Sequence, residues 1–212
     1  MEDNISFQNQ YIHNDSLPKP NHRIIVPALL RLLPKEKNLK ILDIGCGNGS
    51  LDNVIHNYGY NIVGLDSSNS GISFAMESFP EIKFIHGNIY NFNSGLLPEK
   101  DFDIVIAMDI IEHLQFPREL LSFAKKFLKP SGTFILSTPY HGYIKNLAIS
   151  ILGKWDYHHA ALSNLGHIKF FSRKSLSQLL LEEGFLPTKF KFAGRLPLLW
   201  ESMLCSAVYR DK

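Results

Sequence analysis

Residues 108–114 read MDIIEHL and place two carboxylates and an imidazole within five positions, at Asp109, Glu112 and His113. They directly follow FDIVIA, an apolar run that is typical of a buried strand. If a helix begins near Asp109, the three side chains lie at positions i, i+3 and i+4 and share one face of one turn. Carboxylates and imidazoles together can take a proton from a hydroxyl group or bind a divalent metal ion.

Three interpretations of this trio remain open at the level of sequence. In the first, Asp109 caps a helix, Glu112 complements the helix dipole and His113 packs without taking part in chemistry. In the second, His113 is a general base. In the third, the trio binds a metal ion that holds a substrate oxygen.

A glycine-rich loop lies earlier in the chain, in ILDIGCGNGSL (41–51), between a predicted strand and a predicted helix. Gly45, Gly47 and Gly49 would let the backbone approach a ligand closely, and the start of the helix offers free N–H groups. About twenty residues further on, Asp66 ends the next strand, where a carboxylate can bind a ribose.

The spacing of this loop is G-x-G-x-G, whereas dinucleotide-binding loops have G-x-G-x-x-G. Asp43 also stands beside the loop, and its negative charge would repel a pyrophosphate. The site therefore suits a ligand with an adenosine and a cationic, amino-acid-like end. S-adenosylmethionine is such a ligand.

The elements that would position these residues alternate between apolar runs and amphipathic segments, which is the pattern of an α/β domain. The continuous apolar character of the runs indicates parallel strands that are covered on both faces. Strands are predicted at 39–45, 61–66, 82–87, 102–108, 132–138, 187–194 and 201–210. Helices are predicted at 22–33, 49–59, 70–79, 117–129 and 173–184.

Residues 139–168 are too long for an ordinary connection between two elements, and such insertions are often functional. An apolar helical face is predicted within them, formed by Ile144, Leu147, Ala148, Ile151 and Leu152. A lid helix that packs on the body is the favoured interpretation. Contact with a lipid-like substrate or a membrane surface is the alternative.

The bulk composition limits the class of protein. With 212 residues, 45% hydrophobic and 20% charged, the chain is expected to form one globular domain, 1–212. A net charge of +2, with scattered lysines, argues against nucleic acid as a partner. Two cysteines, a polar N-terminus and no apolar run of about 20 residues predict a cytoplasmic protein without a transmembrane segment.

The segments ILDIGCGNGSL, VGLDSS, FIHGNIYNF, FDIVIAMDIIEHL and LKPSGTFILSTP together resemble the successive motifs of Rossmann-like (class I) S-adenosylmethionine-dependent methyltransferases. The similarity is strongest to the branch that includes the ubiquinone-biosynthesis O-methyltransferases. It implies an α/β fold with a seven-stranded mixed sheet in the order 3-2-1-4-5-7-6, whose seventh strand is antiparallel, with helices on both faces.

The same resemblance implies a set of cofactor-binding residues. They are Gly45, Cys46 and Gly47 beside the methionine part, Asp43 toward its ammonium group, Asp66 at the ribose, Ser67, Asn88 and Ile89 at the adenine, and Met108 through its backbone. The family more often has Asp at the position of Asn88, but an amide can both accept from and donate to an adenine.

An N-terminal segment, expected within residues 1–35, resembles the part of such enzymes that covers the cofactor. Tyr11, His13 and His22 are its candidate contacts, and ordinary surface or helix-cap roles are equally compatible with their positions.

The segment GHIKFFSRKSL (166–176) resembles a region of the small-RNA 3′-end 2′-O-methyltransferases, which combine an E-x-x-E-H turn with a downstream histidine around a divalent metal ion. The resemblance implies Asp109, Glu112, His113 and His167 as metal ligands. Asp109 is the weakest of these matches, because it stands in place of a glutamate and is one methylene shorter. Glu112, His113 and His167 are also the candidate catalytic residues.

The function implied is methyl transfer from S-adenosylmethionine to a small-molecule hydroxyl oxygen, with a quinol, a sugar or a lipid-like molecule as the acceptor. An RNA 2′-O-methyltransferase is one alternative. A non-catalytic module that binds S-adenosylmethionine or S-adenosylhomocysteine is another.

Overall fold

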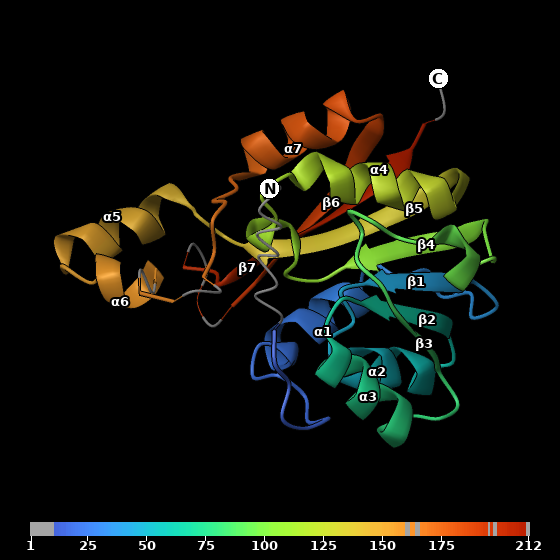
Figure 1. The fold of residues 1–212 in the computed structure, drawn as a ribbon. Coiled ribbons are helices and arrows are strands. Elements are labelled where there is room, and N and C mark those ends of the chain that lie inside the picture. Colours follow the sequence, from blue (N-terminus) through green and yellow to red (C-terminus); the bar gives the residue numbers. More distant parts are fainter. Residues whose placement is uncertain (1–10, 160–161, 164–165, 195, 197–198, 211–212) are drawn as a thin grey trace, which may run out of the picture.

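A single seven-stranded sheet organises the molecule in the computed structural model, which describes residues 11–159, 162–163, 166–194, 196 and 199–210. The strand order is β3-β2-β1-β4-β5-β7-β6 (Figure 1), as the sequence predicted. The strands are β1 Lys40–Ile44, β2 Asn61–Asp66, β3 Lys83–His86, β4 Phe102–Ala107, β5 Leu128–Pro139, β6 Phe185–Ala193 and β7 Ser202–Tyr209. β7 is antiparallel to both of its neighbours, and the other neighbouring strands are parallel.

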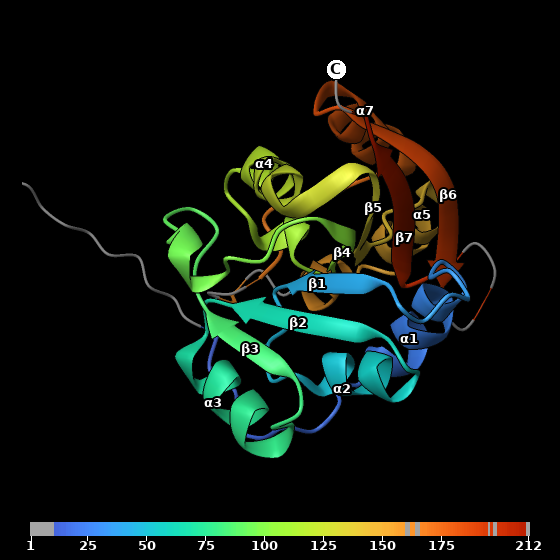
Figure 2. The same ribbon diagram turned by 90° about the vertical axis from the view of Figure 1, so that its right-hand side faces the viewer.

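Helices cover both faces of this sheet (Figures 1 and 2). On one face lie α1 His22–Leu30, α2 Ser50–Asn57 and α3 Asn69–Ser78, and on the other lie α4 Pro117–Phe127 and α7 Arg173–Glu182. Each face buries its own cluster of apolar side chains, one around Ile41, Ile55 and Ile104, the other around Leu42, Phe123 and Phe134. Because parallel strands end at the same edge, the residues that follow β1, β2 and β4 meet there.

The end of α4 and the start of β5, predicted at residues 129 and 132, differ from the prediction for one physical reason. The helix predicted to reach residue 129 ends at Phe127, and Leu128 already pairs with Phe102 as part of β5. Pro130 disfavours a helical conformation at the residue before it and cannot donate a helical hydrogen bond.

The condition that a helix begins near Asp109 is not met. A single 3₁₀ turn, η2 Ile111–His113, stands there instead, and α4 begins only at Pro117. Asp109 itself has a left-handed backbone with φ of 54°, so the chain turns sharply after β4. Glu112 and His113 are therefore presented by a short turn, and Asp109 does not share a helical face with them.

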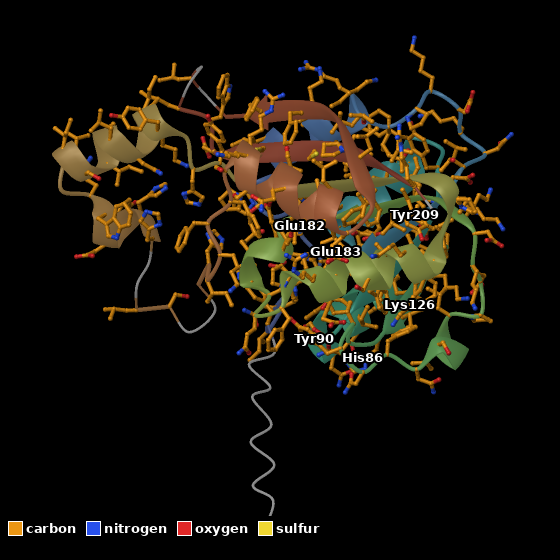
Figure 3. All side chains as sticks on the ribbon, turned by 90° about the horizontal axis from the view of Figure 1, so that it is seen from above. His86, Tyr90, Lys126, Glu182, Glu183 and Tyr209 are labelled. Carbon is orange, nitrogen blue, oxygen red and sulfur yellow. The ribbon has the colours of Figure 1, made fainter. Side chains whose placement is uncertain are left out.

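The insertion forms two short helices, α5 Tyr143–Ile151 and α6 Trp155–His159, which pack against each other and are called the hairpin below. They project from the sheet in Figures 1 and 3, and the apolar side chains of α5 are largely exposed. The apolar face of α5 is therefore not packed on the body in this structure, and the role of the insertion as a lid stays a prediction. The described helices include none that is long and apolar enough to cross a membrane.

Candidate active site

The glycine-rich loop connects β1 to α2 in a conformation that requires glycine. Gly45 and Gly47 have φ values of +89° and +58°. A Cβ atom on Gly45 would lie 2.2 Å from the Ile110 Cδ1 atom, and one on Gly47 would lie 3.0 Å from the His13 Cε1 atom. The loop is therefore closely surrounded on two sides, and any side chain added there would be strained as well as crowded.

Asp66, at the end of β2, holds this loop in place. Its Oδ2 atom accepts a hydrogen bond from the Gly47 N–H at 2.7 Å, and its Oδ1 atom accepts one from the Ser68 N–H at 2.6 Å. A carboxylate oxygen can accept more than one hydrogen bond. Asp66 therefore retains acceptor capacity, and its role at the hydroxyl pair of a ribose stays a prediction.

Residues 11–21, here called the cover segment, lie over the loop. The Asn48 Nδ2 atom donates to the backbone oxygens of Asp15 and Leu17 at 2.9 and 3.0 Å. The Ser68 hydroxyl donates to the backbone oxygen of Tyr11 at 2.5 Å. His13 is buried in this arrangement. The predicted N-terminal cover is thus in contact with the loop from Tyr11 onward, and its first ten residues lie outside the described part of the chain.

A small cavity of about 60 Å³ remains between the cover segment and the loop. Asp43, Gly45 and Met108 line it, as do His22 and Lys19. Met108 and His22 were both expected near the cofactor. Lys19 was missed, because an isolated lysine in a polar segment carries no sequence signal for a place in a cavity.

Electrostatics in this cavity are dominated by carboxylates. Burial, reinforced by the charge of Asp66 and opposed by that of Lys19, raises the pKa of Asp43 to about 8. Asp52 on α2 is fully buried, has no hydrogen-bond partner among the described residues, and has a pKa that burial raises well above the usual range. Sequence reasoning missed Asp52 as well. A cationic group that entered the cavity would favour the ionised form of Asp43 and so lower its pKa.

Not every predicted cofactor residue faces this cavity. Cys46 does line the cavity, but it is buried, its sulfur packs against Gly64, and burial raises the pKa of its thiol, so it contributes packing there. Asn88 and Ile89 follow β3. Asn88 is exposed and accepts a hydrogen bond from the Tyr90 N–H at 3.0 Å, while Ile89 packs toward the α4 face of the sheet. The exposed Ser67 lies at the end of β2.

Glu112 and His113, which are adjacent in the sequence, lie close to His167 from a distant segment. Among the described residues they form a group whose possible ligand atoms all lie within 4.8 Å of one another. The ring centroids of the two histidines are 4.9 Å apart. The backbone oxygen of Glu112 accepts hydrogen bonds from the N–H groups of Ile168 and Lys169 at 2.9 and 3.0 Å, which fixes the second histidine's segment beside the turn. These three residues are called the Glu–His cluster below.

The carboxylate of Glu112 is the unusual member of the Glu–His cluster. It is 0% exposed, and neither oxygen makes a hydrogen bond of good geometry within the described parts of the chain, although the Thr138 hydroxyl lies close enough to oppose the rise in its pKa. Burial, reinforced by the charge of Asp109, raises its pKa well above the usual range. Burial and the neighbouring His113 lower the pKa of His167. A buried, unpaired carboxyl group is costly unless a ligand or an ion completes it.

Asp109 does not belong to this group. Its Oδ2 atom accepts from the Asn21 Nδ2 atom at 2.7 Å, and its Oδ1 atom accepts from the Ser137 hydroxyl at 2.5 Å. The Asp109 N–H in turn donates to the Ser137 oxygen at 2.8 Å. Because Asp109 also lines the cavity, it stands between the loop and the Glu–His cluster and ties the end of the cover segment to β5.

Comparisons with known proteins give the family of this chain. A family model described as a methyltransferase domain matches residues 19–188. A ubiquinone biosynthesis O-methyltransferase of Dinoroseobacter shibae is 31% identical over 157 residues, 71% of this chain and 61% of that protein. A mitochondrial ubiquinone biosynthesis O-methyltransferase of Schizosaccharomyces pombe is 28% identical over 154 residues, which are 69% of this chain and 55% of that protein. The chain thus spans about half the length of the curated relatives it matches.

Solved structures of low identity share the fold. Magnesium protoporphyrin IX methyltransferase of Synechocystis, with bound S-adenosylhomocysteine, has a TM-score of 0.64 at 18% identity, covering 87% of this chain and 80% of that one. An S-adenosylmethionine-dependent methyltransferase of Mesorhizobium loti has a TM-score of 0.66 at 19% identity, covering 86% and 96%. This chain belongs to the methyltransferase domain family and has the Rossmann-like fold of S-adenosylmethionine-dependent methyltransferases.

Proposed function

We propose that this protein binds S-adenosylmethionine and transfers its methyl group to a hydroxyl oxygen of a small molecule. The observation that carries the proposal is the convergence of Glu112, His113 and His167 at the edge of the sheet that also holds the glycine-rich loop. The names of the relatives, ubiquinone biosynthesis O-methyltransferases, support oxygen as the accepting atom.

The glycine-rich loop and its carboxylates suit the cofactor. Asp66 would bind the ribose, and the acidic cavity beside Asp43 would attract the ammonium group of the methionine part. Lys19 lines the same cavity and would pair with the carboxylate of that amino acid. The cofactor supplies the electrophilic methyl group, so the protein has to align the acceptor and remove its proton.

The Glu–His cluster provides groups that can take this proton. A lowered pKa keeps the His167 imidazole neutral near pH 7, and a neutral imidazole is able to accept a proton from a hydroxyl group. His113 is exposed on its turn and is the first choice for the base, with the buried Glu112 carboxyl positioning the cluster from below.

The same residues fit a divalent metal ion. Their ligand atoms are close enough to share one ion, and the unpaired Glu112 carboxylate lacks the partner that such an ion would supply. Two imidazoles and a carboxylate favour Mn²⁺, Co²⁺, Fe²⁺ or Zn²⁺ over Mg²⁺, which prefers oxygen ligands. When bound, such an ion would lower the pKa of the acceptor hydroxyl.

Replacing the two histidines separately tests this proposal. His113→Ala and His167→Ala should each abolish transfer of labelled methyl groups to acceptors in a cell extract, because each removes part of the cluster. S-adenosylhomocysteine affinity should stay within a few fold in calorimetry, because neither residue lines the cofactor cavity. His56→Ala on α2 is the matched control and should retain transfer.

Exhaustive chelation of metal ions distinguishes catalysis through a bound ion from general-base catalysis by His113. If activity disappears and returns with a stoichiometric amount of Mn²⁺, Co²⁺, Fe²⁺ or Zn²⁺, the cluster acts through an ion. Activity that survives chelation removes the ion from the proposal and leaves His113 as the general base. Full transfer by both alanine variants would contradict any role of the Glu–His cluster.

A further inference from the structure

A second cavity lies between helix α4 and the segment that joins β3 to β4, and it is called the α4 cavity below. Its volume is about 360 Å³, a size typical of small-molecule sites. Tyr90, Phe92 and Lys100 line it from the joining segment, and Phe123, Lys126 and Phe127 line it from α4. No described residue lines both this cavity and the one beside the glycine-rich loop. Figure 3 labels Tyr90 and Lys126, one from each wall.

Three phenylalanines give the α4 cavity an apolar wall. The rings of Phe92 and Phe123 meet edge to face with their centroids 5.2 Å apart. The Phe127 ring lies 5.0 Å from that of Phe123 and 6.0 Å from that of Phe92. Phe123 and Phe127 are buried in the core, which holds their rings in place. A flat apolar group that entered the cavity would find fixed aromatic surfaces to pack against.

Two lysines bring positive charge to the same cavity. Lys100 and Lys126 both line it and both are exposed, and neither forms an ion pair within the described parts of the chain. Glu99, the acidic neighbour of Lys100, pairs instead with Lys83 at 2.5 Å. The described residues that line the cavity include no acidic side chain. The positive charge at the aromatic wall is therefore left without a counter-charge.

We propose that the α4 cavity binds a small organic anion with a flat apolar body, an aromatic carboxylate or sulfonate, at a site separate from that of the cofactor. The body would pack against Phe92 and Phe123, and the acidic group would pair with the amino groups of Lys100 and Lys126. Unpaired lysines and small apolar hollows are each common on protein surfaces. Their coincidence in one cavity carries the proposal, because charge complementarity then favours an anion over a neutral molecule of the same shape.

Fluorescence titration of the full chain with 8-anilinonaphthalene-1-sulfonate tests this proposal. N-phenyl-1-naphthylamine has the same aromatic body without the sulfonate, and the wild type should bind it about fivefold or more weakly, because two ion pairs are lost. Lys100→Gln with Lys126→Gln should remove most of this preference for the anion. The matched control, Lys35→Gln with Lys189→Gln, replaces two exposed lysines elsewhere and should keep it.

Two further measurements locate the bound probe. The hairpin also exposes apolar side chains, since Ile151 is 75% exposed and Leu152 64%. Ile151→Ser with Leu152→Ser should nevertheless bind the sulfonate as the wild type does. Saturating S-adenosylhomocysteine should not displace the probe, although Ile89 lines the α4 cavity and is also an expected adenine contact.

Four results would overturn the proposal. They are equal affinity for the two probes, an unchanged preference in the Lys100 and Lys126 double variant, loss of binding in the hairpin variant, and displacement of the probe by S-adenosylhomocysteine. The last two would place the probe on the hairpin or in the cofactor cavity. None of these measurements depends on methyl transfer, so their failure is distinguishable from a failure of the proposed function.

Discussion

Asp43 and Asp66 end neighbouring strands of one sheet but have different surroundings. Asp66 accepts two backbone hydrogen bonds, whereas Asp43 is 1% exposed and its Oδ1 atom has no partner among the described residues. One carboxylate therefore organises the loop, and the other is stored in a mostly protonated form near pH 7, because its pKa is raised to about 8. Each role leads to a measurable consequence.

Binding of S-adenosylhomocysteine should release a proton near pH 7. In the free protein Asp43 is mostly protonated, and an ammonium group placed beside it favours the carboxylate, so the proton leaves. Apparent affinity should therefore rise between about pH 6 and about pH 8. Calorimetry in two buffers with different heats of ionisation measures the release. Asp43→Asn should remove most of it, and an unchanged proton count in that variant would contradict the assignment.

Asp66→Ala should weaken binding of S-adenosylhomocysteine by about 1.5–3 kcal/mol, the range for hydrogen bonds to a charged group. Asp66→Asn keeps one oxygen acceptor and should lose less. Glu81→Ala, at an exposed position before β3, is the control and should bind normally. Equal affinity in all three variants would show that the ribose does not bind at Asp66.

At the scale of elements, the β1–α2 loop and the strand ends were predictable, because glycine spacing and apolar runs are local signals. The turn after β4 was not, because it depends on tertiary bonds. Asp109 takes a left-handed conformation and bonds to Asn21 and Ser137, which are distant in sequence. The outward apolar face of the hairpin was also not predictable, since periodicity identifies a face but does not say which way it points.

Replacing residues 143–157 with a short flexible linker should preserve cofactor binding and remove methyl transfer. The hairpin helices pack on each other and lie away from the cofactor cavity, so the sheet should fold without them. We still expect the insertion to act as a mobile cover over the acceptor site. Calorimetry and transfer of labelled methyl groups measure the two properties. Normal turnover by the shortened protein would place the acceptor site elsewhere.

At the scale of the whole molecule, the strand order followed from the resemblance of five motifs in their correct sequence, not from any single one. The convergence of His113 and His167 depends on the same topology. The segment after the hairpin returns to the edge of the sheet, where Ile168 and Lys169 bond to the backbone of Glu112. Lys19 and Asp52 could not be found from the sequence, because only the packed structure buries them or encloses them in a cavity.

A ligand that binds only the folded state stabilises it by mass action. S-adenosylhomocysteine at 100 times its Kd should add about 2.7 kcal/mol to the free energy of unfolding. The increase should be measurable as a higher denaturation midpoint. NAD at the same concentration should add nothing, because the loop has the spacing G-x-G-x-G and not the G-x-G-x-x-G of dinucleotide-binding loops. A larger increase in the free energy of unfolding with NAD than with S-adenosylhomocysteine would contradict the assignment of the loop to S-adenosylmethionine.

The most direct test of the central claim follows the methyl group itself. Cell extract is incubated with the protein and with S-adenosylmethionine that carries a ¹³C-labelled methyl group, and the ¹³C chemical shift of the product identifies the atom that accepts it. We predict that the labelled product is a small molecule with the label on oxygen, formed by the wild type and not by His113→Ala. A label on nitrogen or carbon, or on RNA, or equal labelling by the variant, would contradict it.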